Sequence, residues 1–204
     1  MGGTLNPLAQ IKSEYSVSLS SKIQQQVNQA VLYLQQGKTI AYPTEAVYGL
    51  GCDPFNEKAV ADLFHVKQRP LEKGVILVAA SVAQITEWVE LDGASWQQQV
   101  LETWPGPVTW ILPIKKPMPD WITGGRDTVA IRISSHPIVQ ALCKQFSGPI
   151  VSTSANISSQ PPAKSCEQII KVFDDKVYCV DAELGGLDQP TQIRDARTAQ
   201  VLRP

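Results

Sequence analysis

The chain has 204 residues, with 18 Lys and Arg against 19 Asp and Glu, so its formal net charge is −1. Hydrophobic residues make up 43% and charged residues 18%, which excludes a disordered chain and fits a globular protein of one domain. The balanced charge excludes a histone-like polycation, so any nucleic-acid contact must come from a local patch. No apolar run reaches the roughly 18 residues of a membrane span, and no secretory signal pattern is present. We expect a soluble, cytoplasmic protein that does not bind membranes.

The cysteines and histidines show no pattern typical of a disulfide-linked or zinc-binding protein. Cys52, Cys143, Cys166 and Cys179 form no CxxC pair and no regular spacing. We therefore expect no disulfide framework, as in a reducing compartment. His65 and His136 lie far apart and belong to no zinc-binding pattern, so we predict no zinc site.

Helix and strand patterns alternate along the whole chain after a polar, non-periodic start. We expect a flexible arm over residues 1–20. The capping-box pattern Ser21-x-x-Gln24 then opens the first helix. In chain order the predicted elements are a helix from 21 to about Gly37, a strand over 38–42 ended by Pro43, a helix capped by Asn56, a strand over 74–80, short helices after Ser81 and over 96–104, a strand over 108–114, a Pro/Gly-rich loop over 115–127, a strand over 128–133, a helix over 136–146, a strand over 149–152, a helix capped by Ser165, and strands over 176–181, 191–195 and 200–203. This alternation, without repeats, predicts one α/β (α+β) domain with a mixed sheet.

The segment 42–51 (YPTEAVYGLG) combines a strand end, a proline, a hydroxyl, a carboxylate and two glycines. Such a turn can present Thr44 and backbone N–H groups to a small ligand. It can equally be a tight turn between a strand and a helix, and the sequence leaves both interpretations open.

The segment 67–74 (KQRPLEKG) carries three cations and one carboxylate. If it is extended, Lys67 and Arg69 point the same way and can grip a polyphosphate. A charge run is more often only a solvated surface. Lys73 either adds a phosphate contact or faces solvent.

The segment 151–156 (VSTSAN) places three hydroxyls and an amide at a strand end, which suits either a ligand or a local turn with an Asn cap. Arg132 lies inside the apolar run TVAIRIS and therefore needs an anionic partner. That partner is either an Asp or Glu of the fold or a carboxylate of the substrate.

Taken together, these segments resemble the YrdC family of threonylcarbamoyl-AMP synthases in its short, single-domain form. The resemblance covers about residues 21–204. It rests on the ordered landmarks YPTEAVYGLG at 42–51, KQR at 67–69, WPGPVT at 104–109, VAIR at 129–132 and STSAN at 152–156. It implies a catalytic domain over 21–204, with a twisted mixed sheet flanked by helices around a concave central cavity.

The resemblance also implies roles for individual residues. Lys67 and Arg69 are expected to hold the phosphates of ATP and to be the catalytic residues. The other residues expected to bind ATP are Thr128, Ser154, Asn156 and Arg203. Those expected to bind threonine are Thr44, Arg132, Ser152 and Thr191, the last standing where many relatives have Ser.

The implied reaction joins L-threonine, bicarbonate and ATP into threonylcarbamoyl-adenylate and pyrophosphate, with Mg²⁺ accompanying the ATP. Partner proteins then transfer the threonylcarbamoyl group to adenosine 37 of tRNAs that read ANN codons. The main alternative is a non-catalytic module that binds tRNA or rRNA through cations around 67–73, 115–116 and 126–132. Direct tRNA contact is possible for the enzyme as well.

Overall fold

The computed structural model describes residues 19–70 and 74–204, so most of the expected arm over 1–20 lies outside the described residues. The helices are α2 (Ser21–Gln35), α3 (Glu57–Lys67), α4 (Gln97–Glu102), α5 (Asp120–Thr123), α6 (Pro137–Phe146) and α7 (Cys166–Phe173). The strands are β1 (Ile40–Pro43), β2 (Tyr48–Gly51), β3 (Ile76–Ala79), β4 (Val108–Pro113), β5 (Thr128–Ile133), β6 (Ile150–Ser154), β7 (Tyr178–Cys179), β8 (Gln192–Asp195) and β9 (Val201–Arg203). Short 3₁₀ turns cover Val82–Gln84 and Asp174–Lys176.

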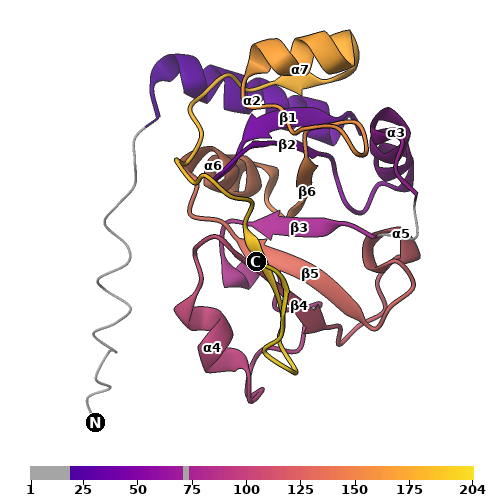
Figure 1. Ribbon diagram of the computed structural model, residues 1–204, viewed down its shortest axis with the longest axis vertical. Coiled ribbons are helices and arrows are strands. Elements are labelled where there is room, and N and C mark those ends of the chain that lie inside the picture. The colour runs from indigo at the N-terminus through magenta and orange to yellow at the C-terminus, as the bar shows by residue number, and fades with distance from the viewer. Residues whose placement is uncertain (1–18, 71–73) are drawn as a thin grey trace.

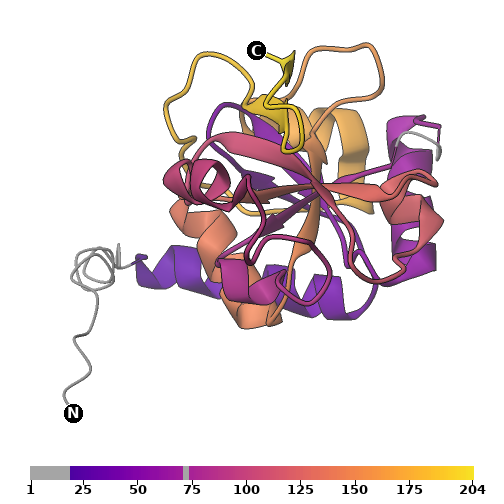
Figure 2. The same cartoon turned by 90° about the horizontal axis from the view of Figure 1, so that it is seen from below.

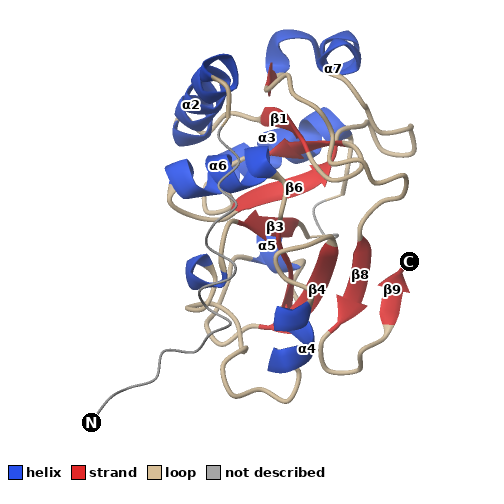
Figure 3. Ribbon diagram, turned by 90° about the vertical axis from the view of Figure 1, so that its left-hand side faces the viewer, coloured by secondary structure: helices blue, strands red, loops and turns tan. Residues whose placement is uncertain are grey.

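The described strands form one nine-stranded sheet in the order β7-β1-β2-β6-β3-β5-β4-β8-β9. The pairs β1/β7, β3/β5 and β4/β8 are parallel, and the other neighbours are antiparallel. Figure 1 shows this twisted sheet with helices packed around it, and Figure 3 shows β8 and β9 at its C-terminal edge. The predicted α/β domain with a mixed sheet is therefore confirmed.

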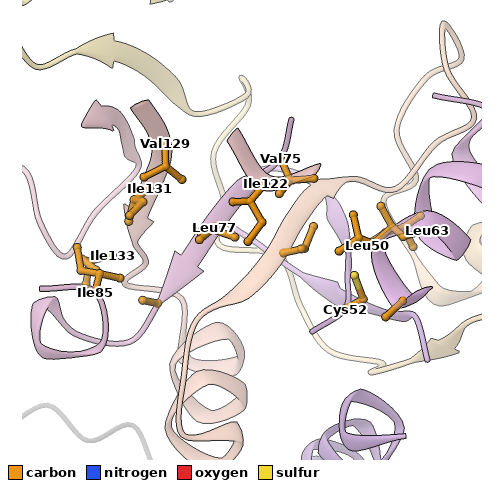
Figure 4. Close-up of a cluster of buried hydrophobic side chains, with 14 of the residues drawn as sticks. Leu50, Cys52, Leu63, Val75, Leu77, Ile85, Ile122, Val129, Ile131 and Ile133 are labelled. Atoms are coloured by element: carbon orange, nitrogen blue, oxygen red, sulfur yellow. The ribbon is translucent and has the colours of Figure 1, made fainter. Parts of the chain in front are cut away.

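Alternation along the strands separates two hydrophobic clusters on the two faces of the sheet. One cluster joins α2 and α6 to inward residues of the strands, such as Val78 and Ile150. The other takes their neighbours Leu77 and Val151 and packs them against α3. Figure 4 shows this second cluster, which extends from Leu63 of α3 and Leu50 of β2 through Leu77 of β3 to the β5 side chains.

Three local expectations are corrected by the structure. The hydroxyl that caps α2 belongs to Ser20, whose Oγ accepts from the Ile23 N–H, and not to Ser21. The segment 42–51 is not a turn between a strand and a helix: Pro43 pairs with Tyr48, so β1 and β2 form an antiparallel hairpin with Thr44 in its loop. The Pro/Gly-rich loop over 115–127 contains the single helical turn α5.

The expectation that the chain has no disulfide is wrong for one pair of cysteines. Cys166, at the start of α7, is bonded to Cys179 of β7, with 5.9 Å between their Cα atoms. Helix α7 packs against β7, so the fold brings together two cysteines whose spacing in sequence gave no signal. Cys52 and Cys143 are buried free thiols, and burial raises the pKa of Cys143 to about 12.

Across residues 19–70 and 74–204, no helix has the length and apolar character required to cross a membrane.

Candidate active site

A cavity of about 570 Å³ is lined mainly by residues of the sheet, and none of its described lining residues belongs to the α2–α6 cluster. Strand alternation explains its polar wall, because Thr128, Ala130 and Arg132 face the cavity between β5 neighbours that enter the other cluster. Ser152, Thr153 and Ser154 at the end of β6 also line it. The segment before β8 and strand β9 complete the wall, and Figure 2 shows them on the side of the molecule away from α2 and α6.

The cavity gathers eight of the ten predicted site residues from distant parts of the chain. They are Thr44, Arg69, Thr128, Arg132, Ser152, Ser154, Thr191 and Arg203. Lys67 and Asn156 do not line it; they lie behind the wall, against the turn that follows β6.

Arg132 dominates one end of the cavity. Its guanidinium is almost fully buried and forms an ion pair with Glu45, with 3.4 Å between Arg132 Nη2 and Glu45 Oε2. Arg132 Nη1 donates to Thr191 Oγ1 at 3.0 Å and to Thr109 Oγ1 at 3.3 Å, whereas its Nε has no hydrogen-bond partner. Of the two partners that the sequence left open, the carboxylate of the fold is present, and the guanidinium still lines the cavity.

Hydroxyl groups surround this end. Thr44 sits in the tight β1–β2 loop, where its Oγ1 donates to the Val47 carbonyl at 2.7 Å. Thr191 is fixed through its carbonyl, which accepts from Arg203 Nε at 3.1 Å and Nη2 at 2.7 Å. Burial, together with the charge of Arg132, lowers the pKa of Arg203. This end therefore combines a compensated arginine with several hydroxyls, a set suited to the carboxylate and hydroxyl of a small amino acid.

Lys67 holds the turn that follows β6. Its side chain is only 2% exposed, and its ammonium donates to the carbonyls of Ser154 and Asn156, the latter at 2.8 Å. Burial, aided by the charge of Arg69, lowers the pKa of Lys67 to about 8. Lys67 therefore reaches the cavity wall through the backbone of residues 154–156.

The segment 67–69 is not extended, so the condition under which Lys67 and Arg69 would point the same way is not met. Lys67 is the last residue of α3, and Gln68 adopts the left-handed conformation with φ of 51°, which turns the chain between them. Arg69 instead lines the cavity and donates from Nη2 to the Gly74 carbonyl at 3.1 Å, while its Nε is buried without a hydrogen-bond partner. Burial also lowers the pKa of Arg69. Lys73 lies outside the described residues.

Ser154 and Asn156 form a compact polar turn above Lys67. Ser154 Oγ donates to Asn156 Oδ1 at 2.6 Å, and Asn156 Nδ2 donates to the carbonyls of Ile157 and Gln160. The Asn156 amide is thus used within the turn, whereas Ser154 also borders the cavity. Of the two interpretations of this segment, the local turn is present, and ligand binding by its side chains stays a prediction.

Sequence reasoning did not single out three residues of the site. Arg126 lines the cavity, Thr109 contacts Arg132, and Glu45 compensates its charge. Thr109 and Glu45 lie within segments that the sequence marked, WPGPVT and YPTE, but no spacing rule links either of them to Arg132 across the sheet.

The described residues contain no group of three or more His, Cys, Asp or Glu side chains placed to hold a metal ion. No carboxylate is found among the described residues that line the cavity, which presents Arg69, Arg126, Arg132 and Arg203 instead. This donor set suits anionic groups, and the described lining residues give a divalent cation no carboxylate ligand.

Comparisons with known proteins agree with this geometry. The model of the Sua5/YciO/YrdC family, described as "Telomere recombination", matches residues 32–204. The chain belongs to the Sua5/YciO/YrdC family. A threonylcarbamoyl-AMP synthase of Xanthomonas euvesicatoria is 52% identical over 182 residues, which cover 87% of this chain and 96% of that protein. One from Xanthomonas campestris is 50% identical over 177 residues, which cover 85% and 95%.

Solved structures of this family share the fold. Sua5 of P. abyssi in complex with L-threonine superposes with a TM-score of 0.81 at 33% identity, over 89% of this chain and 54% of that chain. The chain thus matches about half of Sua5. YciO of E. coli has a TM-score of 0.76 at 26% identity, over 88% and 89%. A Sua5/YciO/YrdC domain therefore spans nearly all of the described residues.

Proposed function

We propose that this chain is a threonylcarbamoyl-AMP synthase, which makes threonylcarbamoyl-adenylate and pyrophosphate from L-threonine, bicarbonate and ATP. The observation that carries the proposal is a single cavity with two chemically distinct ends. Arg132 with its hydroxyls forms one end, and Arg69, Thr128 and Ser154 form the other. Relatives of about 50% identity over nearly their whole length carry the same name.

Arg132 is the natural partner for the carboxylate of threonine. Its guanidinium can pair with a planar anion in a fork geometry. Thr44, Ser152 and Thr191 then surround the amino acid, and each hydroxyl can donate or accept a hydrogen bond. This places the amino group toward the middle of the cavity, where bicarbonate converts it to a carbamate with loss of water.

The cationic end takes the triphosphate. Arg69, whose buried Nε lacks a partner, is the direct phosphate ligand, and the Lys67 charge acts from behind the 154–156 turn. The carbamate oxygen attacks the α-phosphorus, a P–O bond forms, and the bond to pyrophosphate breaks. Repulsion between the carbamate and the phosphates makes such cations necessary, because charge must be offset where it builds up.

No Asp, Glu or His lines the cavity in the described part of the chain, so the side chains there include no evident general base. Positioning and electrostatics then supply most of the rate. Mg²⁺ would arrive bound to the ATP phosphates and add positive charge there. Its ligands would be phosphate oxygens and water, since the cavity wall offers arginines and hydroxyls.

The product is a labile mixed anhydride, so a protein acceptor must take it on. We propose that this chain acts in the cytoplasm and delivers the adenylate to partner proteins that modify adenosine 37 of tRNA. The cavity shelters the adenylate from water until that transfer.

The test is pyrophosphate release from ATP by the purified protein, with threonine and bicarbonate omitted in turn. Release that requires both supports the synthase. Folded protein that releases none, but binds tRNA with a steep dependence on salt, would instead indicate the RNA-binding module.

A further inference from the structure

Glu45 stands behind the wall of the cavity that Arg132 lines. A second hollow, of about 600 Å³, is lined by Glu45 together with His136 and residues 181–185. Neither Glu45 nor His136 lines the first cavity, and Arg132 does not line the second. The Glu45–Arg132 ion pair therefore crosses the wall between the two.

The Glu45 carboxylate is held in place from several sides. Its Oε1 accepts from Ser134 Oγ at 2.6 Å, and Ser134 Oγ itself accepts from the His136 N–H at 3.1 Å. The backbone of Glu45 is fixed as well, because its carbonyl accepts from the Leu187 N–H at 2.9 Å. Gly185 packs so closely that a Cβ there would lie 2.9 Å from Glu45 Cα.

His136 fastens the loop that covers Glu45. Its Nδ1 accepts from the Ile138 N–H at 3.3 Å, so Nε2 carries the proton that is donated to the Glu183 carbonyl at 3.2 Å. Burial lowers the pKa of His136, which favours this neutral form. Glu45 thus lies in a rigid pocket and has little freedom to follow a moving partner.

Arg132 depends on this fixed carboxylate. Both residues are 4% exposed, and a buried guanidinium is costly without an anion. The ion pair at 3.4 Å leaves Glu45 Oε2 and Arg132 Nε without hydrogen bonds. Glu45 therefore anchors one side of the guanidinium without using all of its donors.

We propose that Glu45 is a positioning residue for amino-acid recognition: it fixes the plane of the Arg132 guanidinium so that the remaining donors meet the substrate carboxylate. The proposal rests on the proposed function for the identity of the substrate. Glu45 itself does not touch threonine. Its loss weakens threonine binding and leaves the ATP end of the cavity unchanged.

The decisive variant is Glu45→Gln. The amide oxygen can still accept from Ser134, but an NH₂ group replaces Oε2 and faces the donors of Arg132, so the guanidinium must move. We expect Kd and KM for L-threonine to rise about tenfold, because small displacements of an orienting group cost one to two orders of magnitude. KM for ATP should stay within twofold. Threonine binding is also measured by calorimetry, which needs no turnover.

Two further variants separate positioning from general destabilisation. Ser134→Ala keeps both charges but frees Oε1, and we expect a rise of about threefold in Kd for threonine from the loss of one hydrogen bond. Glu183→Gln makes the same change at an exposed carboxylate of the second hollow and should leave both substrates unaffected.

The proposal is overturned if Glu45→Gln binds threonine within twofold of the parent or more tightly, or if Kd for ATP rises as much as Kd for threonine. Failure of the proposed function is a different result: the parent would bind threonine but release no pyrophosphate. If the parent binds no threonine at all, both are wrong.

Discussion

The two ends of the cavity bury positive charge in different ways. Arg132 is paired with a carboxylate of the fold, which holds it in place and offsets its charge. The hydrogen-bond partners of Lys67 in the described part of the chain are neutral oxygens, and burial together with the repulsion of Arg69 lowers its pKa to about 8. The contrast indicates that one end is built for shape recognition of a small monoanion, and the other keeps uncompensated charge for a polyanion.

The largest effect is expected from removing the compensated arginine. Arg132→Ala should lower kcat/KM for threonine at least about 100-fold, because the carboxylate loses the guanidinium proposed to bind it. It also leaves Glu45 buried without a partner, which costs about 3–5 kcal/mol of stability. Steady-state kinetics and thermal unfolding measure the two effects.

Arg132→Lys is the control for charge. It keeps a cation beside Glu45 and should recover most of the stability but little of the threonine specificity, since the fork geometry is lost. Full activity in this variant would contradict shape recognition at that end.

The second effect concerns Lys67. Lys67→Ala should cut turnover at least about tenfold, because the carbonyls of Ser154 and Asn156 lose their cationic donor and the phosphates lose a nearby charge. Lys58→Ala is the matched control, since Lys58 lies on the same helix with its side chain 83% exposed. Equal turnover in the two variants would show that Lys67 is dispensable.

Because the pKa of Lys67 is low, we expect nucleotide affinity and stability to change with pH near 8. The group is charged below about pH 8 and neutral above it, so nucleotide affinity should fall as pH rises through about 8. The linked effect on stability has the opposite sign. The unfolded chain holds this proton up to a higher pH, so the cost of burying the charge is removed as pH rises from about 8 toward the ordinary lysine value.

Isothermal titration of a non-hydrolysable ATP analogue between pH 6.5 and 9.5 measures the first effect. Lys67→Gln should bind more weakly and lose the step near pH 8. If the affinity of the parent protein for the analogue did not change across this pH range, the Lys67 charge would not contribute to nucleotide binding.

The extent to which the sequence predicts this site follows from the range of the interactions. Ser154 and Asn156 are two residues apart on a strand end, so a local polar turn could be expected. Glu45 and Arg132 are 87 positions apart, and only the packing of the β1–β2 loop against β5 brings them together. No local pattern specifies that contact.

The orientation of Lys67 relative to Arg69 could not be predicted either, although the two residues are close in sequence. Its spacing to Arg69 suggested two side chains on one face, but the left-handed Gln68 at the end of α3 separates them. Helix length decides whether such a pair is extended, and helix ends are the least certain feature of a sequence pattern. Strand β3 was easier to predict, since residues 74–80 form a continuous apolar run.

The smallest effects are expected from two serines of one strand, each assigned to a different end of the cavity. Ser152 and Ser154 share one face of β6 and line the same cavity, two residues apart. Ser152→Ala should raise KM for threonine by about two- to tenfold with little change for ATP, and Ser154→Ala should do the reverse, because each loses one hydroxyl contact. Steady-state kinetics with each substrate varied in turn gives both values. If both variants changed the same KM, the boundary between the two ends would not lie between these two residues.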